Sequence, residues 1–170
     1  MELYDVAVGS YRQILEAAAG VLQKGARYCQ ENGIALQEVV DSRLHPDMYS
    51  FHFQVVCITH HSLGAIHGIE AGEFAPPDYP DTDYEGLQAM TQNTLDALNG
   101  MRPEDVNALA GRKLVFKLGG NEIPFTAENF VLSFSLPNFY FHATTAYDIL
   151  RSKGVPLGKR DFIGRLKMGA

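Results

Sequence analysis

Apolar side chains recur at intervals of three and four residues along most of the chain, the spacing that places them on one face of an α-helix. The first run extends from Tyr4 to Gln30 and ends before Asn32-Gly33, a typical helix stop. A short connecting helix is expected over 35–44. A second long helix is expected from Pro46 to Gly72, because proline is favoured in a first helical turn. The same spacing predicts a third long helix over 83–98.

Two segments between these helices lack the helical spacing. Residues 74–82 contain three prolines, which have no backbone donor, and therefore predict a surface connection. Residues 113–125 alternate polar and apolar side chains on both sides of Gly119-Gly120-Asn121, which is typical of a β-hairpin with a tight turn. A short helical stretch at 103–109 precedes this hairpin.

The last long helix is expected to begin at Pro137. A helical run over 130–136 meets this proline, so we expect a new helix to start there and continue to Lys153. Residues 155–170 then predict an extended tail laid over the helices. The whole pattern indicates one mainly helical domain over 1–170, an up-and-down four-helix bundle with the hairpin inserted before the last helices.

Composition narrows the classes of function. The 170 residues are 46% hydrophobic, which is enough for a packed core, and carry a formal net charge of -6, which disfavours binding to nucleic acid. The two cysteines lack a Cys-x-x-Cys spacing, so neither a disulfide framework nor a thiolate metal site is indicated. No apolar run approaches the about 18 residues that span a bilayer, and no signal peptide is recognisable. We therefore expect a cytoplasmic protein without a membrane partner.

Five of the six histidines lie between residues 45 and 67. His60 and His67 point within about 20° of each other on an ideal helix, but two turns separate them. His52 and His61 face other directions. Because no pair has the i, i+4 spacing of metal ligands, the simplest interpretation is solvent-facing or singly hydrogen-bonded histidines.

His142 is the strongest candidate for chemistry. It ends the aromatic run Phe139-Tyr140-Phe141, with Asn138 one turn before it and Thr145 and Tyr147 after it. Burial among aromatic rings lowers the pKa of an imidazole and favours a neutral base or ligand. The alternative is a core histidine whose hydrogen bonds are satisfied by a carbonyl or a tyrosine hydroxyl.

Two long motifs in the last third of the chain carry a resemblance to a known family. Residues 136–151, LPNFYFHATTAYDILR, and 154–162, GVPLGKRDF, closely resemble a family of helical-bundle proteins of unknown function allied to the DinB/YfiT-like superfamily. Leu3-Tyr4-Asp5, Pro46-Asp47-Met48 and the hairpin fit it too, so the resemblance covers nearly the whole chain.

The resemblance implies a metal site as one hypothesis. Better-known members of that superfamily bind a divalent metal through one histidine of the second long helix and a His-x-x-x-His pair on the last. His142 would match the second histidine of the pair, and His60 or His52 the ligand from the second helix, for zinc, nickel or iron. Asn138 stands where the first histidine of the pair would be, and an amide oxygen is a weaker ligand than imidazole. The leading hypothesis therefore contains no cofactor.

That hypothesis is a cofactor-free enzyme of the isomerase, cyclase or dehydratase type acting on a hydrophobic compound. His142 would be the general acid or base, and Asn138 and Tyr147 would orient a polar group of the substrate. The side chains expected to hold the apolar body of the substrate are Phe51, Phe139, Tyr140, Phe141 and Thr145. The alternatives are a metal-dependent enzyme and a non-catalytic homodimeric interaction domain.

Overall fold

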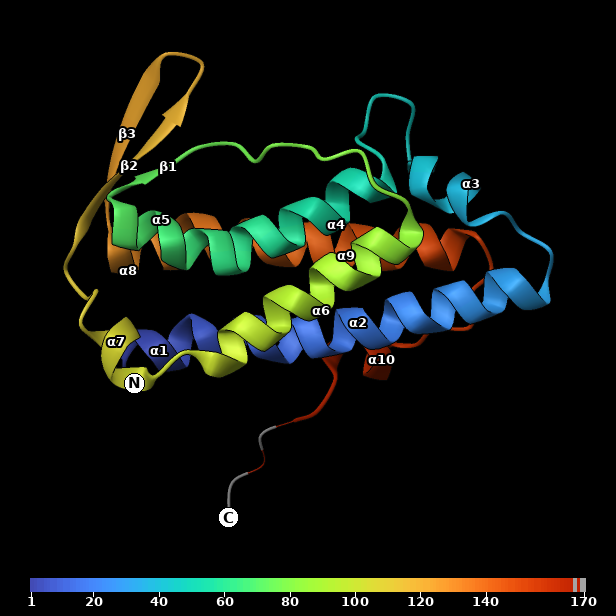
Figure 1. Ribbon diagram of the computed structural model, residues 1–170, viewed down its shortest axis with the longest axis horizontal. Coiled ribbons are helices and arrows are strands. Elements are labelled where there is room, and N and C mark those ends of the chain that lie inside the picture. The colour runs from blue at the N-terminus through green and yellow to red at the C-terminus, as the bar shows by residue number, and fades with distance from the viewer. Residues whose placement is uncertain (167, 169–170) are drawn as a thin grey trace.

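The computed structural model describes residues 1–166 and 168 and is mainly helical, with a small three-stranded sheet at one end (Figure 1). Three long helices are α2 (Val8–Glu31), α6 (Tyr84–Gly100) and α9 (Leu136–Ser152). A fourth long segment is composite and lies between α2 and α6 in the sequence. The composite segment packs on α9 and α6, and α2 packs on the same two helices, so all four long segments enclose one apolar core.

The composite segment begins later than predicted. It consists of α4 (Phe51–Thr59), the π-helical turn η1 (His60–Gly64) and α5 (Ala65–Ala71). Ser50 is extended, so the predicted start at Pro46 is wrong by about one turn. Gly72 ends the segment with a φ of 79°, the left-handed conformation that glycine adopts at helix ends.

The predicted break at Pro137 is also wrong, because the chain stays helical through it. Helix α8 (Ala127–Phe130) is capped by the Thr126 hydroxyl and continues through the π-helical turn η2 (Val131–Ser135) into α9. The Leu136 N–H donates to the Val131 carbonyl, five residues back. This wider turn accommodates the proline, which has no backbone donor of its own.

The hairpin forms around Gly119 and Gly120, which both have positive φ. Its strands are β2 (Lys113–Leu118) and β3 (Asn121–Thr126), paired antiparallel. The short strand β1 (Glu73–Phe74) adds to β2 in parallel, at the start of the connection predicted from its prolines. The sheet therefore ties the end of α5 to the segment before α8.

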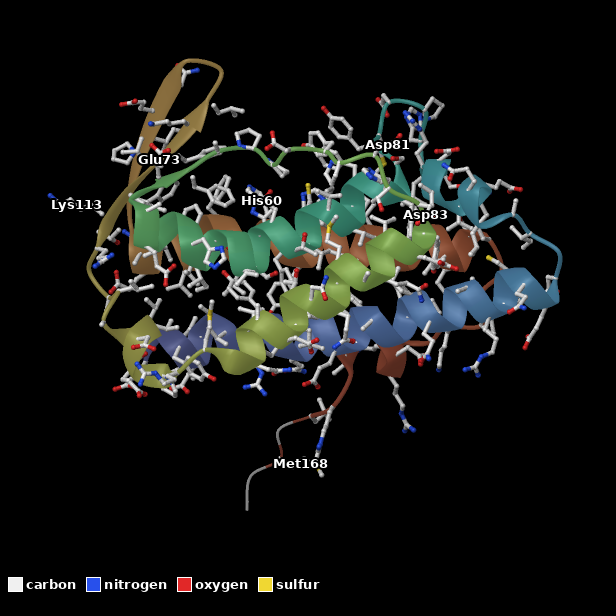
Figure 2. All side chains as sticks on the ribbon, viewed as in Figure 1. His60, Glu73, Asp81, Asp83, Lys113 and Met168 are labelled. Atoms are coloured by element: carbon white, nitrogen blue, oxygen red, sulfur yellow. The ribbon has the colours of Figure 1, made fainter. Side chains whose placement is uncertain are left out.

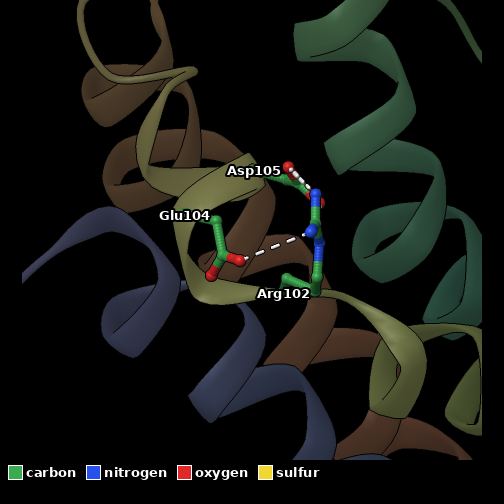
Figure 3. Close-up of polar contacts among 3 residues, drawn as sticks. All are labelled: Arg102, Glu104 and Asp105. Atoms are coloured by element: carbon green, nitrogen blue, oxygen red, sulfur yellow. Dashed lines mark hydrogen bonds and ion pairs between the residues drawn. The ribbon is translucent and has the colours of Figure 1, made fainter.

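Short helices close the two ends of the molecule. Helix α1 (Leu3–Val6) meets α7 (Pro103–Asn107), where the Asn107 side chain accepts from the Tyr4 N–H. At the start of α7 the Arg102 guanidinium donates to both carboxylate oxygens of Asp105, each at 2.8 Å, and lies beside Glu104 (Figure 3). The short connecting helix α3 (Leu36–Asp41) packs on α4 and α6. None of the described helices is long and apolar enough to cross a membrane.

The sequence predicts an extended C-terminal tail, and this prediction is wrong over 159–163. Val155 and Leu157 are buried, and the chain then forms α10 (Lys159–Ile163), which packs against α2. Residues 167, 169 and 170 of the predicted tail lie outside the described part of the chain. A half-buried Phe162 and a glycine after it allow this short helix to form and end.

Candidate functional site

His142 is held by the amide of Gln54, a buried residue of α4. The Gln54 Nε2 donates to the Tyr49 carbonyl at 3.1 Å, and Oε1 lies 2.7 Å from His142 Nδ1. Because the amide nitrogen is the donor to Tyr49, Oε1 accepts and His142 Nδ1 carries the proton. The lone pair of this imidazole is therefore on Nε2, which has no hydrogen-bond partner among the described residues.

A second buried imidazole lies beside the first. His61 comes from η1, and its ring lies nearly parallel to that of His142, with centroids 5.6 Å apart and an angle of 13°. The exposed fractions are 7% for His61 and 8% for His142. His61 Nδ1 is buried and has no hydrogen-bond partner within the described residues. The π-helical turn η1 and helix α9 thus bring a pair of histidines together, and π-helical turns are frequent at functional sites.

Aromatic rings surround this histidine pair and set its electrostatics. Phe53 and Phe141 lie 5.7 and 5.2 Å from the His142 ring, and Phe134 lies 5.6 Å from the His61 ring. Burial lowers the pKa of His142 to about 4. Burial and then repulsion from His142 and His60 lower the pKa of His61 to about 3. Both imidazoles are therefore neutral near pH 7.

A buried hydrogen-bond chain fixes the backbone of His61. Ser135 Oγ, at the end of η2, donates to the His61 carbonyl at 2.6 Å, so the Tyr11 hydroxyl donates to Ser135 Oγ, also at 2.6 Å. Burial raises the pKa of Tyr11, which keeps this hydroxyl protonated. This hydrogen-bond chain links α2, η2 and η1 and holds the two π-helical turns against each other.

Replacing Ser135 by alanine should therefore loosen the site. The change leaves the buried Tyr11 hydroxyl without an acceptor, which costs about 1–3 kcal/mol, and removes the Ser135 donor from the His61 carbonyl. We expect a loss of about 2 kcal/mol in the free energy of unfolding, measured by urea denaturation. Adding Tyr11→Phe to Ser135→Ala should recover part of the lost stability, because no hydroxyl is then left without an acceptor. Equal losses in the single and double variants would contradict the hydrogen-bond chain.

Two predicted polar residues of α9 bond to their own helix. The Asn138 amide nitrogen donates to the Phe134 carbonyl at 2.8 Å, and the Thr145 hydroxyl donates to the Phe141 carbonyl at 2.8 Å. Both lie on the same side of α9 as His142, one turn before it and just under one turn after it. Their oxygen atoms retain acceptor capacity toward a bound molecule.

The predicted aromatic residues fall into different places. Phe139 is fully buried with its edge against Tyr11, at a centroid distance of 5.1 Å, and Tyr140 is exposed. Phe51 and Tyr147 line an internal cavity that His142 does not line. Of the five side chains predicted to hold an apolar substrate, Phe141 is the one whose ring packs on His142.

His52 and His60 hold the proline-containing connection instead of joining His142. His52 Nε2 bonds the Pro80 carbonyl at 2.9 Å, and His60 Nε2 bonds the Ala75 carbonyl at 2.7 Å. Figure 2 shows His60 between the helix and the connection that follows Glu73. Burial lowers the pKa of His60. Within residues 1–166 and 168, no group of three or more His, Cys, Asp or Glu side chains could hold a metal ion, so the predicted ligand set is not brought together.

Sequence reasoning missed Gln54 and His61, although a signal was present. The two residues are seven apart, which places them within about 20° on a helix. His61 also follows Ile58 by three residues and so continues the buried stripe. The directions of the histidines were compared only with one another, and this comparison does not reveal the helix face that His61 shares with Gln54.

Comparisons with known proteins agree with this fold. The family described as "Domain of unknown function (DUF1993)" matches residues 3–163. No curated protein matches the chain. A crystal structure of a DinB family member protein from Shewanella denitrificans is similar at a TM-score of 0.82 and 24% identity, covering 99% of this chain and 95% of that one. At this identity the likeness shows the fold, and the family match shows that the chain belongs to the DUF1993 family.

Proposed function

We propose that this protein is a cofactor-free, small-molecule enzyme in which His142 is the general acid and base, within a four-helix bundle of the DinB type. The observation that carries the proposal is the 2.7 Å bond from His142 Nδ1 to Gln54 Oε1, which leaves the lone pair on Nε2. Gln54 is the positioning residue, because its amide is itself oriented by the Tyr49 carbonyl. A fixed tautomer is a common requirement for an imidazole that moves a proton.

The surroundings of the pair favour an uncharged, largely apolar substrate. Phe53, Phe141 and Phe134 surround the pair with apolar rings, and the two neutral imidazoles are the polar groups among them. A base whose pKa is about 4 is neutral at pH 7 and returns a proton readily once it has taken one. This suits isomerisation, cyclisation or dehydration, in which a proton removed from one atom is delivered to another.

The donor atoms do not fit the metal site of the better-known DinB-like proteins. His61 and His142 supply two imidazoles, and the third position is taken by Asn138, whose amide is bonded to the Phe134 carbonyl. Catalytic zinc usually has three protein ligands that include imidazole, carboxylate or thiolate groups. We therefore derive no catalytic step through a metal.

Proton transfer can be tested before the natural substrate is known. Uncharged ketones that carry an aromatic ring or a branched alkyl group are screened by thermal shift, and compounds that stabilise the protein are incubated with it in D2O. We expect exchange of the hydrogens next to the carbonyl, followed by proton NMR, at a rate that rises through pH about 4 and is level above pH 6, because neutral His142 is the base.

Variants identify the group responsible. His142→Phe should reduce exchange to the rate without protein, and Gln54→Leu should reduce it by about tenfold or more, because the tautomer is no longer fixed. Tyr140→Ser changes an exposed residue of the same helix and should exchange at the wild-type rate. The same exchange rate in His142→Phe and the wild type would remove His142 from the proposal.

A further inference from the structure

An open groove lies between the composite segment, the proline-containing connection and α6. It is lined by residues of α4, η1 and α5, by the connection over 73–80 and by one face of α6. The groove offers about 640 Å³ of accessible space, which is within the range of small-molecule sites. Apolar side chains in its lining include Leu63, Pro76, Pro77, Pro80 and Met90. The groove therefore has room and apolar surface for the body of a small organic molecule.

This groove lies in the most negatively charged part of the chain. Residues 44–101 contain eight Asp and Glu side chains and no Lys or Arg. The other residues carry 14 basic and 12 acidic side chains, so the 44–101 segment accounts for more than the whole net charge of -6. Every residue of the groove lining belongs to this segment. The potential in the groove should therefore attract a cation and repel an anion.

One of the two carboxylates in the lining is not neutralised by a basic side chain. Glu73 is paired with Lys117 at 2.5 Å. Asp78 is exposed and forms no ion pair within residues 1–166 and 168. In Figure 2 the acidic residues Glu73, Asp81 and Asp83 follow the connection, and His60 lies between the connection and the helix. The free carboxylate of Asp78 is therefore the main candidate to contact a bound cation.

His60 supplies a hydrogen-bond acceptor near this carboxylate. Its Nε2 donates to the Ala75 carbonyl, so the lone pair of the neutral ring is on Nδ1. A Cβ at Gly64 would lie 3.0 Å from this Nδ1, and the glycine leaves that space open. Burial lowers the pKa of His60, and the bond to Ala75 and then the charge of Asp78 oppose this effect. A carboxylate and an imidazole lone pair thus act in the same part of the groove.

We propose that this groove binds a small organic cation, in which an ammonium group is attached to an apolar body such as one aromatic ring or a short alkyl chain. The ammonium group donates to Asp78 and to His60 Nδ1, and the body lies on the apolar side chains of Leu63 and Met90. An ammonium ion has three donors and no acceptor, which matches two acceptors without a basic neighbour in the lining. The proposal is independent of the proposed function, because His142 and Gln54 do not line the groove.

The test compares three compounds that share a phenylethyl body and differ in their terminal group: phenethylamine, phenethyl alcohol and hydrocinnamate. Each is titrated into the wild-type protein at pH 7 and low salt, and the protein amide signals are followed by NMR. The amine, which is protonated at this pH, should bind at least about fivefold more tightly than the alcohol, and hydrocinnamate should not bind saturably. Raising NaCl from about 0.01 M to about 1 M should remove most of this preference, because the screening length falls from about 30 Å to about 3 Å.

Three variants assign the preference to the groove. Asp78→Asn removes one exposed charge and should weaken amine binding by about two- to fivefold while leaving alcohol binding unchanged. His67→Lys adds a cation at an exposed residue of the lining and should weaken amine binding to a similar extent. The control Asp96→Asn removes the same charge from an exposed residue of α6 outside the groove and should bind the amine as the wild type does.

The NMR signals also locate the bound molecule, whatever the variants do to stability. Amide shifts caused by phenethylamine should concentrate at Thr59, Gly64, Gly68 and the residues between 73 and 80. Equal affinities for the amine and the alcohol would overturn the proposal. So would equal amine affinities of Asp78→Asn and the wild type, or shifts that concentrate outside the groove.

Discussion

Lowering the pH from 6.5 to 5 should remove about 3 kcal/mol from the free energy of unfolding, because unfolding exposes two histidines that the folded protein keeps neutral. Burial holds the pKa of His142 near 4 and that of His61 near 3, whereas an unfolded histidine has a pKa of about 6.5. Below pH 6.5 the unfolded chain therefore binds protons that the folded chain does not.

The sign follows from proton linkage. Well above pH 6.5, from about pH 7.5, both states are neutral at these residues, so the pair leaves the stability independent of pH. As the pH falls, each histidine lowers the stability by up to about 1.4 kcal/mol per pH unit, until the folded imidazole itself takes up a proton near pH 4 or 3. His60, which packs on His61 and whose pKa burial also lowers, acts in the same direction.

Urea denaturation at pH 7, 6, 5.5 and 5 measures this effect, and this range lies above the titration of most carboxylates. His61→Phe and His142→Phe should each remove about half of the pH dependence of the pair, and the double variant nearly all of it. Each variant also shifts the stability at every pH, for example by leaving the Gln54 amide without its partner. The slope with pH is therefore the decisive quantity, and an unchanged slope in the double variant would show that other groups cause the loss.

The pattern of apolar residues predicted the helices well because burial in a helix imposes a spacing of three and four. The runs at Tyr4–Gln30 and 83–98 correspond closely to α2 with α1 and to α6, where continuous apolar stripes face the core. The hairpin was likewise predicted from the glycines whose positive φ its turn requires. These features depend on local chemistry, which a single sequence contains.

The π-helical turns were not predictable in this way, because each adds about one residue at a single point, and the alternation of three- and four-residue intervals conceals a shift of one residue. Pro137 was interpreted as a break, since a regular α-helix cannot supply its missing hydrogen bond, whereas η2 accommodates it. The contact of Ser135 with the His61 carbonyl joins residues 74 apart in sequence. The tail was interpreted as extended because the packing surface that α2 gives α10 cannot be seen in the tail itself.

The candidate site was predicted only in part, because the sequence around one residue does not show its partners from other helices. His142 was singled out because aromatic neighbours in its own helix indicated burial, and the structure buries it. Its partners Gln54 and His61 come from another helix, so the local sequence around His142 contains no sign of them. The aromatic run beside it was interpreted as one group, although a helix turns consecutive side chains in different directions.

Alanine substitution should therefore lower the free energy of unfolding strongly at Phe139 and hardly at all at Phe141. Phe139 is fully buried with its edge against Tyr11, so Phe139→Ala removes a core ring and leaves a cavity, with an expected loss of about 3–5 kcal/mol in the free energy of unfolding. Phe141 is 56% exposed, and Phe141→Ala should change the stability by less than about 0.5 kcal/mol.

Ketone binding should show the reverse order, with the larger effect in Phe141→Ala and the smaller effect in Phe139→Ala. The Phe141 ring packs edge-on against His142, so Phe141→Ala should weaken ketone binding and slow hydrogen exchange in D2O while the protein remains stable. Phe139→Ala should bind the same ketone with nearly the wild-type affinity at temperatures where it is still folded, because Phe139 faces Tyr11 in the core. Urea denaturation and ketone titration of both variants measure the two effects. A destabilised Phe141→Ala with intact binding would mean that this ring belongs to the core and that a bound molecule reaches His142 from another side.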